Sequence, residues 1–181
     1  SAADSRPPSV TLQQAYSLRD WTIGLRRDLH KCPELLYDLK ETSAYVRRVL
    51  DGLHIPYEYP LAQEGIVATI GTGEAPCVAL RADMDALPIH EEVESSYRSE
   101  TAGKMHACGH DAHTAMLLAA AKMLKEREAE LSGTVKLIFQ PAEEGGAGGL
   151  AMVQAGLLST APKIERVFAL HVWPTLPTGT L

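Results

Sequence analysis

The segment Cys77-Val-Ala-Leu-Arg-Ala82 and the turn after it, Asp83-Met-Asp-Ala-Leu-Pro88, decide the fold. The first six residues are almost continuously apolar, which is typical of a strand buried on both faces of a covered parallel or mixed sheet. Two aspartates then leave the strand two residues apart. We therefore expect a buried strand that brings Asp83 and Asp85 to one edge of a sheet.

The patterns on either side predict alternating helices and strands. Apolar residues at helical spacing predict helices over about 11–30, 41–53 and 112–127, the last one capped by Asp111, and a short helix ending near Gly156. Strands are predicted over 65–71, 134–140 and 166–171. This order indicates an α/β fold with a three-layer α/β/α arrangement, in which the sheet is mixed and mostly parallel.

Composition narrows the class of protein. The chain has 181 residues, 45% of them hydrophobic, and its 17 Lys+Arg against 23 Asp+Glu give a net charge of −6, which argues against a nucleic-acid partner. No apolar run approaches the roughly 20 residues of a membrane span. Three cysteines are a poor disulfide framework. We expect residues 1–10 to form a flexible lead-in and residues 11–181 to fold as part of one domain.

Side chains that bind divalent metals are concentrated in one short run. Three histidines, a cysteine and an aspartate fall within eight residues, namely His106, Cys108, His110, Asp111 and His113. Imidazole and thiolate suit zinc-like metals, and no packing need explains this density. His106 and His113 are the weaker candidates, and His30, His54 and His90 are expected to be structural or exposed.

Further polar candidates follow the predicted strands. Glu143 and Glu144 come after the strand 134–140, and His171 ends the strand 166–171. Ligand sites of open α/β sheets gather at this edge. Consecutive residues leave a strand in opposite directions, so one glutamate can bind metal while the other faces a substrate, although a solvated loop is the alternative. Either Asp83 or Asp85 can orient a metal-bound histidine. Together these residues predict the metal site of a hydrolase.

Three motifs in the same order resemble the M20 metallopeptidase superfamily in its amidohydrolase branch. They are Ala79-Leu-Arg-Ala-Asp-Met-Asp-Ala-Leu-Pro-Ile89, Gly103-Lys-Met-His-Ala-Cys-Gly-His-Asp-Ala-His113 and Phe139-Gln-Pro-Ala-Glu-Glu-Gly-Gly146. This branch includes auxin-conjugate (indoleacetyl-amino-acid) hydrolases, hippurate hydrolases and related N-acyl-amino-acid hydrolases. The segments 54–57 and 66–73 resemble the plant auxin-conjugate hydrolases most.

The resemblance implies the fold of zinc-dependent exopeptidases and a site with two divalent metals. Manganese is the expected metal, with zinc and cobalt as alternatives. The implied metal ligands are Cys108, His110, Glu144 and His171. Glu143 would be the general base and Asp85 a catalytic residue that supports the site, whereas Asp83 is not assigned as a ligand.

The implied reaction is hydrolysis of the amide bond of N-acyl amino acids, with auxin conjugates as the expected small-molecule substrates. The alternatives are another N-acyl-amino-acid hydrolase (a hippuricase, deacetylase or carboxypeptidase) and a truncated, non-catalytic metal-binding module. The resemblance also implies that this chain is the N-terminal part of a catalytic domain, inactive alone. A lid or dimerisation domain, through which the longer protein would form a homodimer, and a C-terminal part would be absent. The expected location is the endoplasmic reticulum lumen for a plant-like protein and the cytoplasm otherwise.

Overall fold

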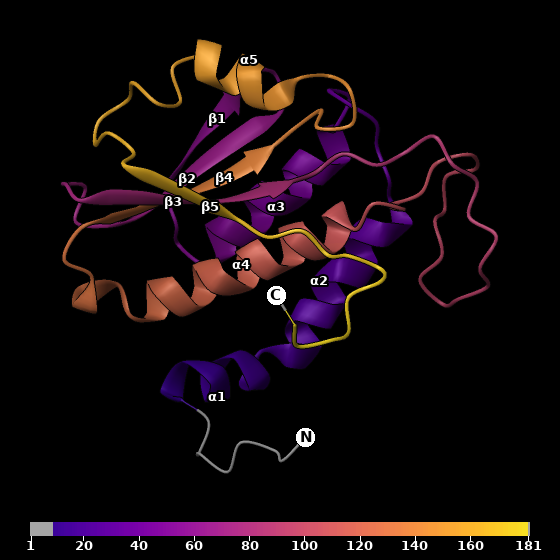
Figure 1. Cartoon of the computed structure of the whole chain (residues 1–181), viewed down its shortest axis with the longest axis horizontal. Coiled ribbons are helices and arrows are strands. Elements are labelled where there is room, and N and C mark those ends of the chain that lie inside the picture. Colours follow the sequence, from indigo (N-terminus) through magenta and orange to yellow (C-terminus); the bar gives the residue numbers. More distant parts are fainter. Residues whose placement is uncertain (1–8, 181) are drawn as a thin grey trace.

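In the computed structural model, which describes residues 9–180, a five-stranded sheet lies between two layers of helices (Figure 1). The helices are α1 (Val10–Ser17), α2 (Arg19–Lys31), α3 (Lys40–Gly52), α4 (His110–Glu126) and α5 (Gly148–Gln154), with a 3-10 turn, η1, over Glu128–Glu130. The strands are β1 (Tyr57–Leu61), β2 (Gly65–Gly71), β3 (Cys77–Asp83), β4 (Thr134–Gln140) and β5 (Arg166–Ala169).

The strands lie in the order β1-β2-β4-β3-β5. The pairs β1/β2 and β2/β4 are antiparallel, and the pairs β3/β4 and β3/β5 are parallel. The expected α/β class and mixed sheet are confirmed, with two of the four pairs parallel where most were expected to be. Because β3, β4 and β5 run in the same direction, their carboxyl ends meet at one edge of the sheet.

Apolar side chains bury both faces of the sheet. On one face α3 and α4 pack over a core that includes Leu118, Leu137 and Phe139, all fully buried, and α2 packs against α4. On the other face Met152 of α5 packs against Ile138 in a smaller cluster (Figure 1). The helices of the larger layer hold the first turn of α4 over the carboxyl edge of the sheet. Within residues 9–180, no helix has the length and apolar character needed to cross a bilayer.

Three local features differ from the sequence-based expectation. The helix expected over 11–30 is divided into α1 and α2 at Leu18, whose N–H contacts the carbonyls of both Gln14 and Ala15. Strand β1 has no counterpart among the predicted strands, and it contains Pro60, which a strand at the edge of a sheet tolerates. Asp111 does not cap α4, because Gly109 holds the cap position with φ of 90°.

The expected lead-in over residues 1–10 lies mostly outside the described residues. Its last two positions begin α1, in which Ser9 is the N-cap and accepts a hydrogen bond from the backbone N–H of Leu12.

Candidate metal centre

The predicted site residues converge at the carboxyl edge of the parallel strands. Asp83 ends β3 and Asp85 follows it, Glu143 and Glu144 follow β4, and His171 follows β5. Cys108 and His110 come from the loop that enters α4 and from its first residue. Segments from four parts of the chain therefore supply one cluster, as the strand order requires.

His110 lies at the centre of the cluster and is fully buried. Its Nδ1 donates a hydrogen bond to the backbone carbonyl of Asp85 at 2.8 Å, which leaves the lone pair on Nε2. Among the described residues this Nε2 atom is buried without a hydrogen-bond partner, and so is Oε1 of Glu144. The two atoms are 3.8 Å apart, and Nε2 is also 3.8 Å from Oε2 of Glu143. These separations exceed a hydrogen bond and are wide enough for a shared cation.

Three overlapping groups of ligand atoms surround His110. In each group the atoms lie within 4.8 Å of one another: Cys108, His110 and His171; His110, Glu143 and Glu144; and Asp83, His110 and His113. The first two groups contain the four metal ligands proposed from the sequence and the proposed general base, Glu143. The third contains Asp83 and His113, which the sequence did not assign as ligands.

In the third group, both ring nitrogens of His113 are used in hydrogen bonds. His113 Nδ1 donates to Oδ1 of Asp83 at 2.6 Å, and His113 Nε2 accepts the backbone N–H of Val172 at 2.9 Å. No lone pair on the His113 ring remains for a metal. The first two groups are therefore the candidate metal-binding sets.

Asp85 connects His110 to the two glutamates. Its buried carboxylate accepts the backbone N–H of Glu143 at Oδ1 and that of Glu144 at Oδ2, both at 3.0 Å. Its backbone carbonyl accepts His110 Nδ1–H. Asp85 thus sets the position of the two glutamates relative to the imidazole through backbone contacts, without offering its own carboxylate to the open side of the cluster.

The glycine-rich stretch after the glutamates lets the chain fold back onto the end of β4. A Cβ atom on Gly148 would lie 1.7 Å from the carbonyl oxygen of Pro141, so only glycine fits there. Tyr37 adds a hydrogen bond from its hydroxyl to the carbonyl of Gly146 at 2.7 Å. As a result Glu144 turns inward, with 22% of its side chain exposed, and Glu143 faces outward, with 42% exposed.

The electrostatics of the cluster favour a bound cation. Burial, followed by the carboxylates of Glu144 and Glu143, raises the pKa of the Cys108 thiol to about 11. Burial works against ionisation of Asp83, but the hydrogen bond that it accepts from His113 and the proximity of His110 and Arg81 outweigh it and lower the pKa to about 2. Several acidic groups, a thiol and an unpartnered imidazole nitrogen therefore share one small volume. This donor set fits a divalent transition metal, which would compensate the negative charge.

Two side chains of α2, Arg26 and His30, make contacts close to the cluster that were not predicted from the sequence. His30, expected to be structural or exposed, is buried and bonds Oδ2 of Asp111 through Nδ1 at 2.8 Å and Oε1 of Glu91 through Nε2 at 3.2 Å. Arg26 pairs with the same Asp111 oxygen at 2.7 Å. The two side chains on α2 thus anchor the first turn of α4, where His110 lies.

The other histidines lie apart from the cluster. His54 and His90 are exposed, as expected. His106 is buried, neither of its ring nitrogens has a hydrogen-bond partner within residues 9–180, and burial lowers its pKa to about 4. It belongs to none of the three ligand groups.

The family is decided by the match of residues 79–181 to the family model described as peptidase family M20/M25/M40. The chain belongs to this family. The matched region contains all the candidate residues of the cluster. This M20 chain is 53% identical over 170 residues to the IAA-amino acid hydrolase ILR1-like 4 of Arabidopsis thaliana, covering 94% of this chain and 38% of the relative.

Bacterial relatives extend the comparison. The M20 chain is 44% identical to an N-acetylcysteine deacetylase of Bacillus subtilis, covering 88% of this chain and 42% of the relative. The solved structure of the Bacillus subtilis YXEP protein, a dinuclear metal binding peptidase from the M20 family, superposes with a TM-score of 0.83 at 41% identity. The superposition covers 90% of this chain and 45% of that one. The chain thus spans less than half the length of these relatives.

Proposed function

We propose that the protein is a metal-dependent amidohydrolase that cleaves N-acyl amino acids, with indoleacetyl-amino-acid (auxin) conjugates as substrates. The observation that carries the proposal is the buried, unpartnered Nε2 of His110, which faces Oε1 of Glu144 and Oε2 of Glu143 at 3.8 Å. The similarity to the Arabidopsis thaliana IAA-amino acid hydrolases supports the choice of substrate.

Cys108, His110, Glu144 and His171 would hold two divalent cations, with manganese proposed ahead of zinc or cobalt. The name of the Bacillus subtilis relative, a dinuclear metal binding peptidase, supports the number of ions. When bound, the ions would polarise the substrate carbonyl and lower the pKa of a water molecule.

Glu143 is the proposed general base, because its carboxylate reaches the open side of the cluster while its backbone is fixed by Asp85. The carboxylate takes a proton from the attacking water as the oxygen bonds to the amide carbon. It then returns that proton to the nitrogen of the leaving amino acid as the carbon–nitrogen bond breaks. The products are a carboxylic acid and a free amino acid. In this proposal Asp85 supports the base without touching the reacting atoms.

A Glu143→Gln variant of a polypeptide extended to the length of the relatives tests the assignment of the base. Loss of general-base catalysis is expected to lower turnover by about 10²- to 10⁴-fold, while metal content measured by elemental analysis stays at the parental value. Glu58→Gln, at an exposed position of β1 on the opposite side of the sheet, is the matched control. Turnover of Glu143→Gln at the parental rate would exclude Glu143 as the base.

A substrate panel separates the proposed reaction from its alternatives. Indoleacetyl-amino acids, N-acetylcysteine and hippurate are to be offered to this chain and to a polypeptide extended to the length of the relatives. Preference for N-acetylcysteine would favour a deacetylase, in line with the Bacillus subtilis relative. Metal binding without turnover of any substrate by either polypeptide would favour a non-catalytic metal-binding module.

A further inference from the structure

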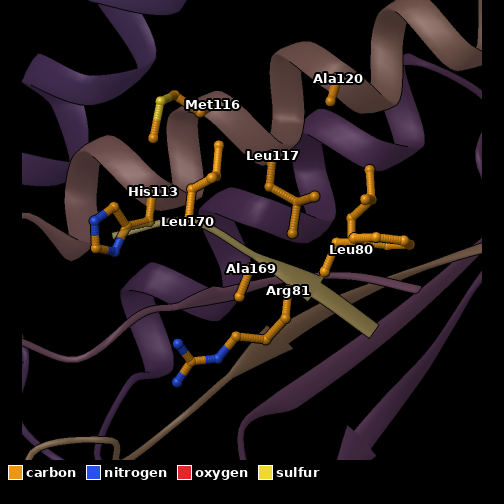
Figure 2. Close-up of a pocket in the computed structure, with 9 residues that line it drawn as sticks. Leu80, Arg81, His113, Met116, Leu117, Ala120, Ala169 and Leu170 are labelled. Atoms are coloured by element: carbon orange, nitrogen blue, oxygen red, sulfur yellow. The ribbon is translucent and has the colours of Figure 1, made fainter. Parts of the chain in front are cut away.

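The segment that carries His171 has little support from the body of the protein. All four residues of β5 are exposed, and β5 pairs with β3 only as far as Arg81 and Ala169. A groove of about 330 Å³ separates β5 from α4 (Figure 2). It is lined largely by apolar side chains, including Leu80, Leu117, Phe168 and Leu170. Pairing in the sheet therefore does not fix the backbone at His171.

A hydrogen bond from α4 fixes that backbone instead. His113 Nε2 accepts the N–H of Val172 at 2.9 Å, and the rings of His113 and His171 lie 4.6 Å apart at 68°. His113 lies at the end of the groove close to Leu170 (Figure 2). Val172 also packs on Gly109, where a Cβ atom would lie 2.3 Å from Cγ2 of Val172. These contacts place His171 Nε2 at 3.4 Å from Sγ of Cys108.

Asp83 determines which nitrogen of His113 can accept. Its carboxylate accepts the His113 Nδ1–H at 2.6 Å, so the proton resides on Nδ1 and the lone pair on Nε2. Asp83 is itself fixed by Arg81 Nη1 at 2.6 Å and by the Thr114 hydroxyl, which donates to its backbone carbonyl at 2.9 Å. A chain of contacts therefore runs from the end of β3 through α4 to the backbone next to His171.

We propose that His113 is a positioning residue that holds His171 in place for metal binding by accepting the N–H of Val172. This inference rests on the proposed function, because it takes His171 as a metal ligand. His113 itself binds no metal in this arrangement, since both its nitrogens are used.

Two substitutions at position 113 separate this role from simple packing. In His113→Gln the amide oxygen occupies roughly the position of Nε2 and can still accept the Val172 N–H. In His113→Asn the shorter side chain can donate to Asp83 but cannot reach Val172. We expect His113→Asn to weaken binding of Mn²⁺, titrated into the metal-free chain, by about 10- to 100-fold, and His113→Gln to retain most of the affinity.

The Val172 amide gives a readout that needs no metal. In the metal-free chain, hydrogen exchange at this amide is expected to be about tenfold faster in His113→Asn than in the parent or in His113→Gln, as for the loss of one hydrogen bond. Val172→Pro removes the donor without touching the buried residues of α4, and Val172→Ala keeps it. We expect Val172→Pro to weaken Mn²⁺ binding and Val172→Ala to leave it unchanged. This pair still tests the inference if His113→Asn fails to fold.

Several results would overturn the inference. One is parental Mn²⁺ affinity in both His113→Asn and Val172→Pro. Another is an equal loss in His113→Gln and His113→Asn together with parental exchange at Val172, which would indicate a packing role. If neither this chain nor a polypeptide extended to the length of the relatives binds Mn²⁺, the proposed metal centre fails. In that case His113 has no metal ligand to position, and the inference fails as well. If Mn²⁺ binds to the parent but exchange at the Val172 amide is the same in His113→Asn as in the parent, the inference alone is refuted.

Discussion

Replacing Asp85 by asparagine is expected to loosen the attachment of the two glutamates to the cluster. Asp85 is 1% exposed, and its carboxylate accepts the backbone N–H groups of Glu143 and Glu144, both at 3.0 Å. Asparagine has nearly the same shape but only one accepting oxygen. Its amide NH₂ would then face one of the two N–H donors, leaving that donor buried without a partner.

The size of the effect follows from these two bonds. A hydrogen bond to a charged group contributes about 1.5–3 kcal/mol, and a buried donor left without a partner costs about 1–3 kcal/mol. Asp85→Asn removes one of the two hydrogen bonds from the backbone N–H groups, and the acceptor of the remaining bond is no longer charged. We therefore expect the free energy of unfolding to fall by about 3 kcal/mol. Metal affinity is expected to fall by about 10- to 100-fold, as for other residues that orient metal ligands.

Urea unfolding of the metal-free chain, followed by circular dichroism, measures the first quantity by linear extrapolation. Asp20→Asn is the matched control, because the Asp20 side chain is 93% exposed and pairs at the surface with Arg19. Its effect should stay within about 0.5 kcal/mol. A loss below about 1 kcal/mol for Asp85→Asn would refute the view that this carboxylate fixes the glutamates.

Three further predictions concern the scaffold. Leu118→Ala, at a fully buried position of α4, should lower the free energy of unfolding by about 2–5 kcal/mol in urea titrations, whereas Leu150→Ala, at an exposed position of α5, should change it by less than about 1 kcal/mol. Gly24→Ala, in the interior of α2 with nothing within 4 Å of the added Cβ, should raise the melting temperature through a gain of about 0.5–1 kcal/mol. The hydrogen bond to Asp111 raises the pKa of His30, so its stabilising contribution is fully present below the ordinary value of 6.5 and is lost as the pH rises through the raised value. His30→Gln should therefore destabilise the chain more at pH 6 than at pH 9, and an equal loss at both would contradict this reasoning.

The core strands and the location of the cluster could be predicted because they depend on local patterns. The continuous apolar runs of β2, β3 and β4 are typical of buried strands. The parallel pairing of β3 with β4 and β5 brings the residues after these three strands to one edge. Strand β1 could not be predicted in this way, since Pro60 argues against a strand unless the edge position is known.

Partnerships over long sequence distances could not be predicted. The bond between His113 and Val172 joins residues 59 positions apart and uses a backbone N–H, which has no signature in the sequence. Likewise, Asp111 reads as a helix cap from its position, but the fold places it beside Arg26 and His30, which offer stronger charged partners. The roles of the cluster residues were inferred from resemblance and remain to be tested by the variants above.

The exposed position of β5 has a consequence for work with the chain in solution. Along its outer side β5 pairs with no other described strand, and Val167 and Phe168 are 50% and 53% exposed. An apolar edge of this kind is a template on which another polypeptide can add a strand and begin aggregation. Dilute samples are therefore preferable for the titrations. Val167→Lys is expected to raise the concentration at which light scattering still finds a monodisperse protein.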